Sequence, residues 1–286
     1  MRKLLLAFPI FCILLGCDDG DVIVTSFDFD DVDLQFCTGA DSYVFFKIND
    51  QAAESLSLLT NIDEDDLKDE DQLEVQLNGT SNFVTYRKYT SEVTSDYFCN
   101  DIPPASPEVT IEYIASSGIA TFTKEITRDD NDGVEEDIDD DLDTDMDGIP
   151  NYYDADDDGD NVRTAIEIGT GDEPQDTDLD GIPDYLDPDD DNDMVLTRYE
   201  AMGTLDPTNI DEDESGVADY LEILVVNSDP IDEYAEHSYT IMSNVLIFLS
   251  DLVLQSDSEV ITQESLDFDS ITNIVNEPET MIPDFN

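Results

Sequence analysis

Residues 143–154 read DTDMDGIPNYYD and residues 176–187 read DTDLDGIPDYLD, so one twelve-residue pattern occurs twice, 33 residues apart. Each copy is followed, after one further residue, by another acidic stretch: DDDGDNVRTAIE at residues 156–167 and DDDNDMVLTRYE at residues 189–200. These two are also 33 residues apart, so a two-loop unit is repeated. We call the four stretches loops 1 to 4 in chain order and number positions 1 to 12 within each.

Carboxylates at positions 1, 3 and 5 with an acid at position 12 suit calcium. Ca2+ takes six to eight oxygens, and such a loop supplies them from positions 1, 3 and 5, a backbone carbonyl at position 7, position 9 directly or through water, and the acid at 12. Glycine at position 6 permits the sharp turn. Mg2+ suits the pattern less, since it prefers to keep its waters. The spacing therefore predicts several bound calcium ions.

A fifth copy, loop 5, reads DEDESGVADYLE at residues 211–222. The five loops together predict the following metal ligands: Asp143, Asp145, Asp147, Ile149, Asn151 and Asp154 in loop 1; Asp156, Asp158, Asp160, Val162 and Glu167 in loop 2; Asp176, Asp178, Asp180, Ile182, Asp184 and Asp187 in loop 3; Asp189, Asp191, Asp193, Val195 and Glu200 in loop 4; and Asp211, Asp213, Asp219 and Glu222 in loop 5.

Some copies depart from the pattern. Asn161 replaces the position 6 glycine in loop 2, and asparagine tolerates a left-handed backbone. Met194 replaces it in loop 4, where a positive φ would be strained. Loop 5 lacks a carboxylate at Ser215, and an upstream partial copy with Gly133 at position 6 has Arg128 at position 1. We expect loops 4 and 5 and the upstream copy to be the weakest sites.

Over residues 143–222 the pattern resembles bacterial thrombospondin type 3 repeats, and its loops are EF-hand-like. The resemblance implies a role in adhesion or extracellular structure. The cysteines that staple the animal repeats are absent here. Metal alone would therefore have to order this arm.

Residues 1–16 have the layout of a secretory signal, with Arg2 and Lys3 before an apolar run too short to cross a bilayer. The run ends at Leu-Leu-Gly before Cys17, which resembles the bacterial lipobox and implies lipidation of Cys17. We therefore expect an outer-membrane lipid anchor, with the protein facing the periplasm or the cell surface. The remaining pair, Cys37 and Cys99, is expected to form a disulfide in that oxidising compartment.

The segments flanking the repeats predict a mainly β fold. Residues 17–127 are expected to form a β-sandwich from strands at 22–29, 42–48, 54–59, 73–77, 83–89, 109–114 and 119–127, with a hairpin turn at 116–118. Residues 128–226 are expected to be a repeat arm with little regular structure. In residues 227–286 the apolar runs 239–254 and 260–268 favour a hairpin packed on the sandwich. A helix over 239–254 is the alternative, because both of its faces are apolar.

Composition limits the function. The chain has 286 residues, 74 acidic against 10 basic, and a formal net charge of −64, with half of the acids in residues 129–222. Nucleic acid is a poor partner for such a chain, whereas cations are good ones. There is no Trp, His237 is the single histidine and is expected to be a surface or structural one, and no Lys or Arg follows Arg198. We therefore expect a binding protein and not an enzyme.

Two functions remain open. The first is a lipid-anchored calcium-binding protein of the envelope or cell surface, with a structural or adhesion role and a protein or glycan partner. The second is an accessory carbohydrate-binding or carbohydrate-degrading lipoprotein in which calcium is only structural. The second needs an exposed aromatic platform, for which Tyr43, Phe45, Tyr86, Tyr89 and Tyr97 are candidates. A solvated acidic spacer without metal does not explain the fixed 33-residue period.

Overall fold

The structure is a computed structural model that describes residues 29–39, 42–69, 72–100, 102–134, 142–257, 259–283 and 285. The predicted signal peptide and Cys17 lie outside the described residues. The chain divides into two compact units, each assembled from separate stretches. Unit 1 contains the chain up to Asn61, Glu74–Thr121 and Phe248–Phe268, and unit 2 contains Ile62–Leu73, Phe122–Ile247 and Asp269–Asn286.

The described residues are mainly β, as the sequence predicts, with 37% strand and 11% helix. The strands are β1 (Gln35–Thr38), β2 (Tyr43–Asn49), β3 (Glu54–Thr60), β4 (Leu73–Gln76), β5 (Phe83–Tyr89), β6 (Val109–Asp129), β7 (His237–Gln255) and β8 (Val260–Met281). Short helical segments lie between them: η1 (Asp65–Leu67), α1 (Asp96–Cys99), η2 (Asn151–Tyr153), α2 (Thr164–Glu167), η3 (Asp184–Leu186), η4 (Thr197–Glu200), η5 (Pro207–Asn209) and η6 (Asp219–Leu221).

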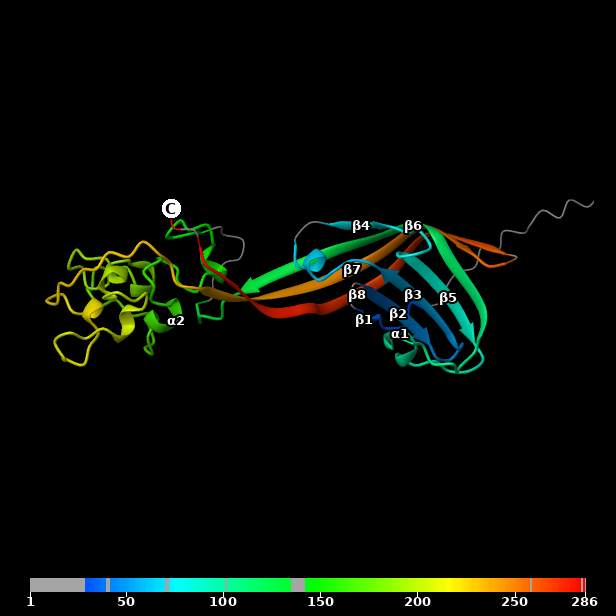
Figure 1. Ribbon diagram of the computed structural model, residues 1–286, viewed down its shortest axis with the longest axis horizontal. Coiled ribbons are helices and arrows are strands. Elements are labelled where there is room, and N and C mark those ends of the chain that lie inside the picture. The colour runs from blue at the N-terminus through cyan, green and yellow to red at the C-terminus, as the bar shows by residue number, and fades with distance from the viewer. Residues whose placement is uncertain are drawn as a thin grey trace, which may run out of the picture. The chain divides into compact units, whose positions relative to one another are not determined.

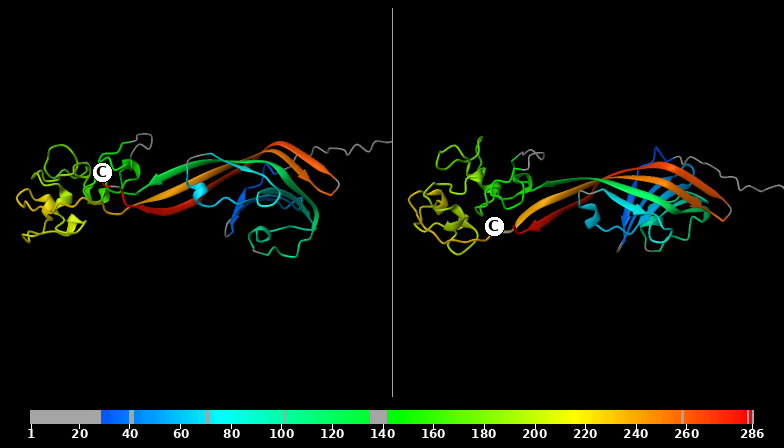
Figure 2. Two further views of the ribbon diagram at one scale, coloured as in Figure 1. Left: turned by 45° about the horizontal axis from the view of Figure 1, so that its top comes forward. Right: turned by 90° about the horizontal axis from the view of Figure 1, so that it is seen from above.

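Within the described chain the strands form a single curled sheet in place of the two separate sheets of a sandwich. Its order is β1-β2-β3-β5-β6-β7-β8, with β4 paired to β6 (Figure 1). The predicted C-terminal hairpin is confirmed as β7 and β8, with β7 between β6 and β8 in the sheet (Figure 2). The C-terminal segment thus joins the sheet by backbone pairing.

The turn predicted at residues 116–118 is wrong, because β6 runs through it as one strand. Gly118 lies there at φ 134° and its carbonyl accepts the Leu77 N–H at 3.0 Å. A Cβ at this position would come within 2.8 Å of Leu252 and 2.9 Å of the Ser250 carbonyl. The glycine therefore permits a close approach of chains, which a Ser-Ser-Gly sequence does not distinguish from a turn.

The alternative of a helix over residues 239–254 is excluded, since this segment lies in β7 as the predicted hairpin requires. Alternate residues from Ile241 to Leu249 are buried, and the burial then shifts to Leu252 and Leu254. Asp251 stands at the shift with φ 52°. This change of alternation is why the run shows apolar residues on both faces.

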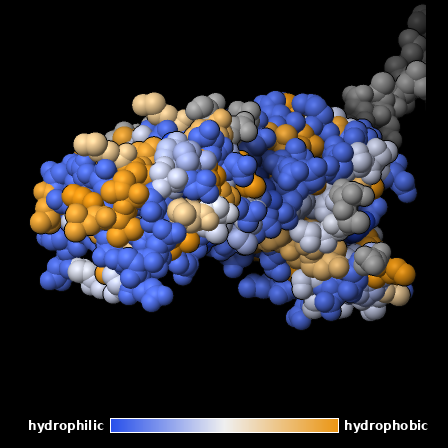
Figure 3. All heavy atoms as spheres, turned by 60° about the vertical axis from the view of Figure 1, so that its left-hand side comes forward, coloured by the Kyte–Doolittle hydropathy of each residue, from blue (hydrophilic) through white to orange (hydrophobic). Residues whose placement is uncertain are grey.

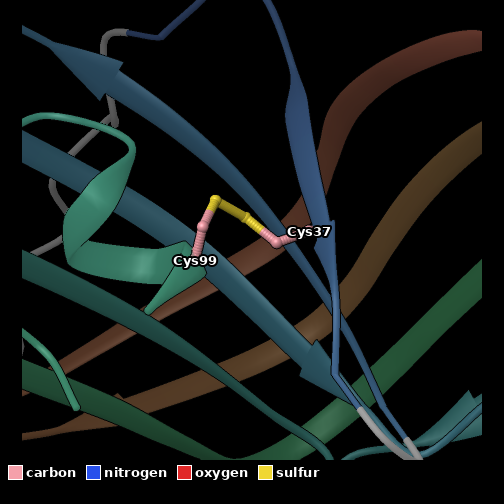
Figure 4. Close-up of a disulfide and its surroundings, with 2 residues drawn as sticks. All are labelled: Cys37 and Cys99. Carbon is pink, nitrogen blue, oxygen red and sulfur yellow. A yellow bond between two sulfur atoms is a disulfide. The ribbon is translucent and has the colours of Figure 1, made fainter. Parts of the chain in front are cut away.

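The core of unit 1 lies against both faces of β2. Phe45 and Phe46 are adjacent in sequence and both are fully buried. Phe46 stacks on Phe98 of α1, with ring centroids 4.4 Å apart. The predicted disulfide joins Cys37 of β1 to Cys99 of α1 across a Cα–Cα distance of 5.4 Å (Figure 4). The strand that carries Cys37 was not among those predicted.

Unit 2 contains the five acidic loops, which have little regular secondary structure, as expected. Each loop ends in a single helical turn over positions 9 to 11 or 12: η2, α2, η3, η4 and η6 in loops 1 to 5 (Figure 1). The turn carries the chain to the acid at position 12. Among the helices of the described residues, none has the length and apolar character of a membrane-crossing segment.

Candidate metal centre

The five loops share one backbone conformation, which their own carboxylates hold. In loop 3, Asp178 Oδ1 accepts the N–H of Asp180 at 2.9 Å, and Asp180 Oδ1 accepts the N–H of Ile182 at 2.8 Å. Asp176 Oδ2 accepts the N–H of Gly181 at 3.2 Å. The corresponding bonds occur in the other four loops, with Ser215 Oγ acting for the missing carboxylate in loop 5. In loops 1, 3 and 4, each of these carboxylates thus uses one oxygen to bend its own chain.

The opposite oxygens are in large part buried and without a hydrogen-bond partner. They are Asp143 Oδ1, Asp145 Oδ2 and Asp147 Oδ2 in loop 1, Asp158 Oδ2 and Asp160 Oδ2 in loop 2, Asp176 Oδ1 in loop 3, and Asp189 Oδ1, Asp191 Oδ2 and Asp193 Oδ2 in loop 4. Buried carboxylate oxygens normally find a donor or a cation. A set of orphaned oxygens in repeated positions therefore marks places that suit a cation.

Positions 1, 3 and 5 converge in three of the loops. The ligand atoms of Asp143, Asp145 and Asp147 lie within 4.8 Å of one another. The same holds for Asp176, Asp178 and Asp180, and for Asp189, Asp191 and Asp193. The sequence-predicted residues are thus brought together in loops 1, 3 and 4.

Loop 2 differs from this arrangement. Both oxygens of Asp156 are used, by the N–H groups of Asp160 at 3.2 Å and Asn161 at 2.9 Å. The group within 4.8 Å is instead Asp158, Asp160, Glu167 and Asp190. Asp190 is position 2 of loop 4 and was not predicted. The available signal was the acid at position 2 of loops 2 and 4, where loops 1 and 3 have threonine.

The closing acids at position 12 occupy different surroundings. Glu167 and Glu200 are buried and neither oxygen of either has a hydrogen-bond partner. Asp154 Oδ1 lies 2.6 Å from Nδ1 of His237, so the single histidine is a buried neighbour of loop 1. Burial opposes a charged imidazolium, but the contact with Asp154 raises the pKa of His237 overall. In loop 5, Glu222 accepts a bond from Ser215 Oγ at 2.7 Å.

Position 9 closes each loop. The side chains of Asn151, Asp184 and Asp219 accept the N–H of the position 2 residue at 3.0, 2.7 and 3.0 Å. Thr164 and Thr197 do the same in loops 2 and 4. Both oxygens of Asp184 are used in this way, since Thr177 Oγ1 donates to the second at 2.8 Å. At position 7, the N–H groups of Ile149, Val162, Ile182 and Val195 bond to position 5.

Positions 4 and 6 of all five loops have positive φ. Glycine occupies position 6 in loops 1, 3 and 5, with φ between 92° and 100°. Asn161 and Met194 adopt the same conformation at 73° and 81°. The upstream copy repeats it at Asn131 and Gly133, and the N–H of Val134 bonds to Asp132 Oδ1 at 2.8 Å. The loop shape therefore survives both substitutions.

Several of the loop carboxyl groups have raised pKa values, first because they are buried and then because neighbouring acids repel their charge. The pKa of Asp191 is raised to about 6, that of Asp145 to about 7 and that of Glu200 to about 8. The pKa of Asp190 is raised to about 10, and Asp158, Asp160 and Glu167 are raised in the same direction. Ionising these groups together requires a compensating positive charge.

The donor set fits a hard cation. Apart from Arg198 Nε, the buried unpartnered side-chain atoms in the loops are carboxylate oxygens. Oxygen-rich, flexible sites favour Ca2+ over transition metals, which prefer nitrogen and sulfur ligands. Loop 5 fits less well, because both oxygens of Asp211 already accept backbone N–H bonds from Ser215 and Gly216. In comparisons with protein-family models, curated proteins and solved structures, none matches the chain.

Proposed function

We propose that this protein is a lipid-anchored calcium-binding protein of the bacterial envelope or cell surface, with a structural or cell-adhesion role. Its loop segment is ordered by Ca2+, and its partner in adhesion is a protein or a glycan. The observation that carries the proposal comes from the carboxylates at positions 1, 3 and 5 of loops 1 and 4: one oxygen of each bends the loop and the other is buried without a donor. Such a loop is shaped for a cation and is electrostatically unfavourable without one.

The calcium part is tested by limited proteolysis of the full chain. Ca2+ at millimolar concentration should suppress cleavage within residues 142–222, and a chelator should restore it. Mg2+ at the same concentration should protect less, because it keeps its waters and requires octahedral geometry. Equal cleavage with Ca2+ and with chelator would contradict the proposal.

The anchor is tested at Cys17, which lies outside the described residues. Cys17→Ala should abolish incorporation of labelled fatty acid and release the protein from membranes. Acyl labelling retained in this variant would contradict the anchor. Calcium-dependent attachment of cells, lost when the variant is released, would support the adhesion role.

The carbohydrate alternative needs an exposed platform of aromatic side chains. Of the five aromatic candidates, Tyr43, Phe45, Tyr86 and Tyr89 are buried in unit 1, at most 8% exposed, and Tyr97 is half-buried. The four buried residues belong to the core, so the five do not form an exposed platform. We therefore propose binding and structure, and not glycan processing, as the function.

A further inference from the structure

Three acids of loop 2 and one of loop 4 form a deeply buried group that could bind a metal together. Asp158, Asp160, Glu167 and Asp190 are each at most 4% exposed, and one ligand atom from each lies within 4.8 Å of the others. No Lys, Arg or His belongs to this group. Its charge is therefore uncompensated by any member.

The side chains of the group have free oxygens. Glu167 and Asp190 each have two buried oxygens without a hydrogen-bond partner, and Asp158 and Asp160 each have one. The other side-chain oxygens of Asp158 and Asp160 accept backbone N–H groups, at 3.3 Å and 2.6 Å respectively. Buried, unpartnered oxygens converging from four side chains are what a cation site requires.

Asp190 belongs to loop 4 by its backbone but to loop 2 by its side chain. Its N–H bonds to Thr197 Oγ1 at 3.3 Å, which is the position 2 to position 9 closure of loop 4. Arg198 Nη1 also donates to the Gly159 carbonyl at 3.3 Å, so a second contact joins loop 4 to loop 2. Meanwhile Asp156, the expected position 1 ligand of loop 2, has both oxygens engaged.

We propose that Asp190 completes the calcium site of loop 2 in place of Asp156, so that one ion is shared between loops 2 and 4. The inference rests on the proposed calcium binding and adds a ligand from a neighbouring repeat. The shared ion links the two 33-residue repeats, loops 1–2 and loops 3–4. Calcium binding at loop 2 therefore depends on the position of loop 4.

The test uses the full chain and calcium alone in calorimetric titration. Asp190→Asn and Glu167→Gln should each weaken one and the same ion by about tenfold or more, because each removes a charged ligand. The double variant should weaken this same ion further and leave the other bound ions unchanged, since both side chains are ligands of one site. Asp190→Asn combined with Glu200→Gln should instead weaken two different ions, because Glu200 belongs to loop 4. Glu212→Gln is the matched control, an exposed acid at position 2 of loop 5, and should bind as the wild type does.

Unfolding in chelator separates ligand loss from misfolding. Both Asp190→Asn and Glu167→Gln should unfold at higher denaturant concentration than the wild type without calcium, since each relieves repulsion. The shared site alone would be overturned if Asp190→Asn bound calcium as tightly as the wild type. It would also be overturned if Asp190→Asn weakened the same ion as Glu200→Gln and not the ion weakened by Glu167→Gln. A wild-type chain that binds no calcium would overturn the proposed function as well.

Discussion

Position 6 of the loops shows how far a single residue affects a repeated turn. Met194 has φ 81° and is 92% exposed. Its backbone is therefore strained, and its side chain makes no packing contacts that would offset the strain. Met194→Gly should raise the free energy of unfolding by about 0.5–1 kcal/mol, because glycine adopts this conformation without steric cost. Denaturant unfolding in saturating calcium measures the change. A loss of stability would show that the side chain has a packing role.

Asn161 occupies the same position but should respond in the opposite sense. Its Nδ2 donates to the Glu233 carbonyl at 3.1 Å, and its Oδ1 accepts the Ala235 N–H at 2.7 Å. Asn161→Gly should lower the free energy of unfolding by about 1–2 kcal/mol, because two hydrogen bonds are lost at a largely buried site. The same denaturation experiment applies. Stabilisation by this change would mean that the bonds to residues 233–235 contribute little.

Position 9 separates loop closure from metal ligation. Asp184→Asn should leave the number of bound calcium ions unchanged, because Asn151 closes loop 1 with the same bond to Thr144. Asp184→Ala should weaken binding at loop 3, because the Thr177 N–H then loses its acceptor. Calorimetric titration of both variants distinguishes them. Loss of one ion in Asp184→Asn would identify Asp184 as a direct ligand.

At the scale of elements, the sequence predicts what is local and misses what depends on other segments. The sharp turn over positions 1 to 6 of each loop is predicted from residue type. It also forms in loops 2 and 4, where Asn161 and Met194 replace the glycine at position 6. Asp190 could not be assigned, since its partners belong to the preceding repeat. At Gly118 the sequence predicts a turn. The structure instead uses this glycine for a close approach to Leu252, a tertiary contact that the local sequence does not indicate. The strand that holds Cys37 is only four residues long, too short for a clear alternation.

The disulfide is the covalent tie within unit 1. Cys37 and Cys99 are 62 residues apart in sequence, and closing a loop of this length removes about 4 kcal/mol of unfolded-chain entropy. Cys37→Ser should lower the unfolding midpoint accordingly, and Cys37→Ser with Cys99→Ser should be no worse. Thermal unfolding with and without reductant measures this. An unchanged midpoint would mean that the bridge adds no stability.

At the scale of the whole molecule, the raised pKa values reverse the usual pH dependence. An acid with a pKa higher in the folded than in the unfolded state binds more protons when folded, so its ionisation costs stability as pH rises. Asp191, Asp145 and Glu200, with pKa values of about 6, 7 and 8, act in this way between pH 5 and pH 8. Acids with lowered pKa values, such as Asp206, stay ionised throughout this range.

In chelator, the free energy of unfolding should therefore fall from pH 5 to pH 8. In saturating calcium it should stay level or rise, because the ion holds the carboxylates ionised and displaces their protons. Urea denaturation at three pH values under both conditions tests this. A metal-free protein that becomes more stable toward pH 8 would contradict the buried, mutually repelling acids.

Half of the acidic residues lie in residues 129–222, a segment that we propose is ordered by calcium. Calorimetric titration of the full chain with Ca2+, followed by circular dichroism before and after chelation, tests this claim most directly. We predict heat from several bound ions and a spectral change when the chelator removes them. No heat at millimolar calcium, together with an unchanged spectrum on chelation, would contradict the account.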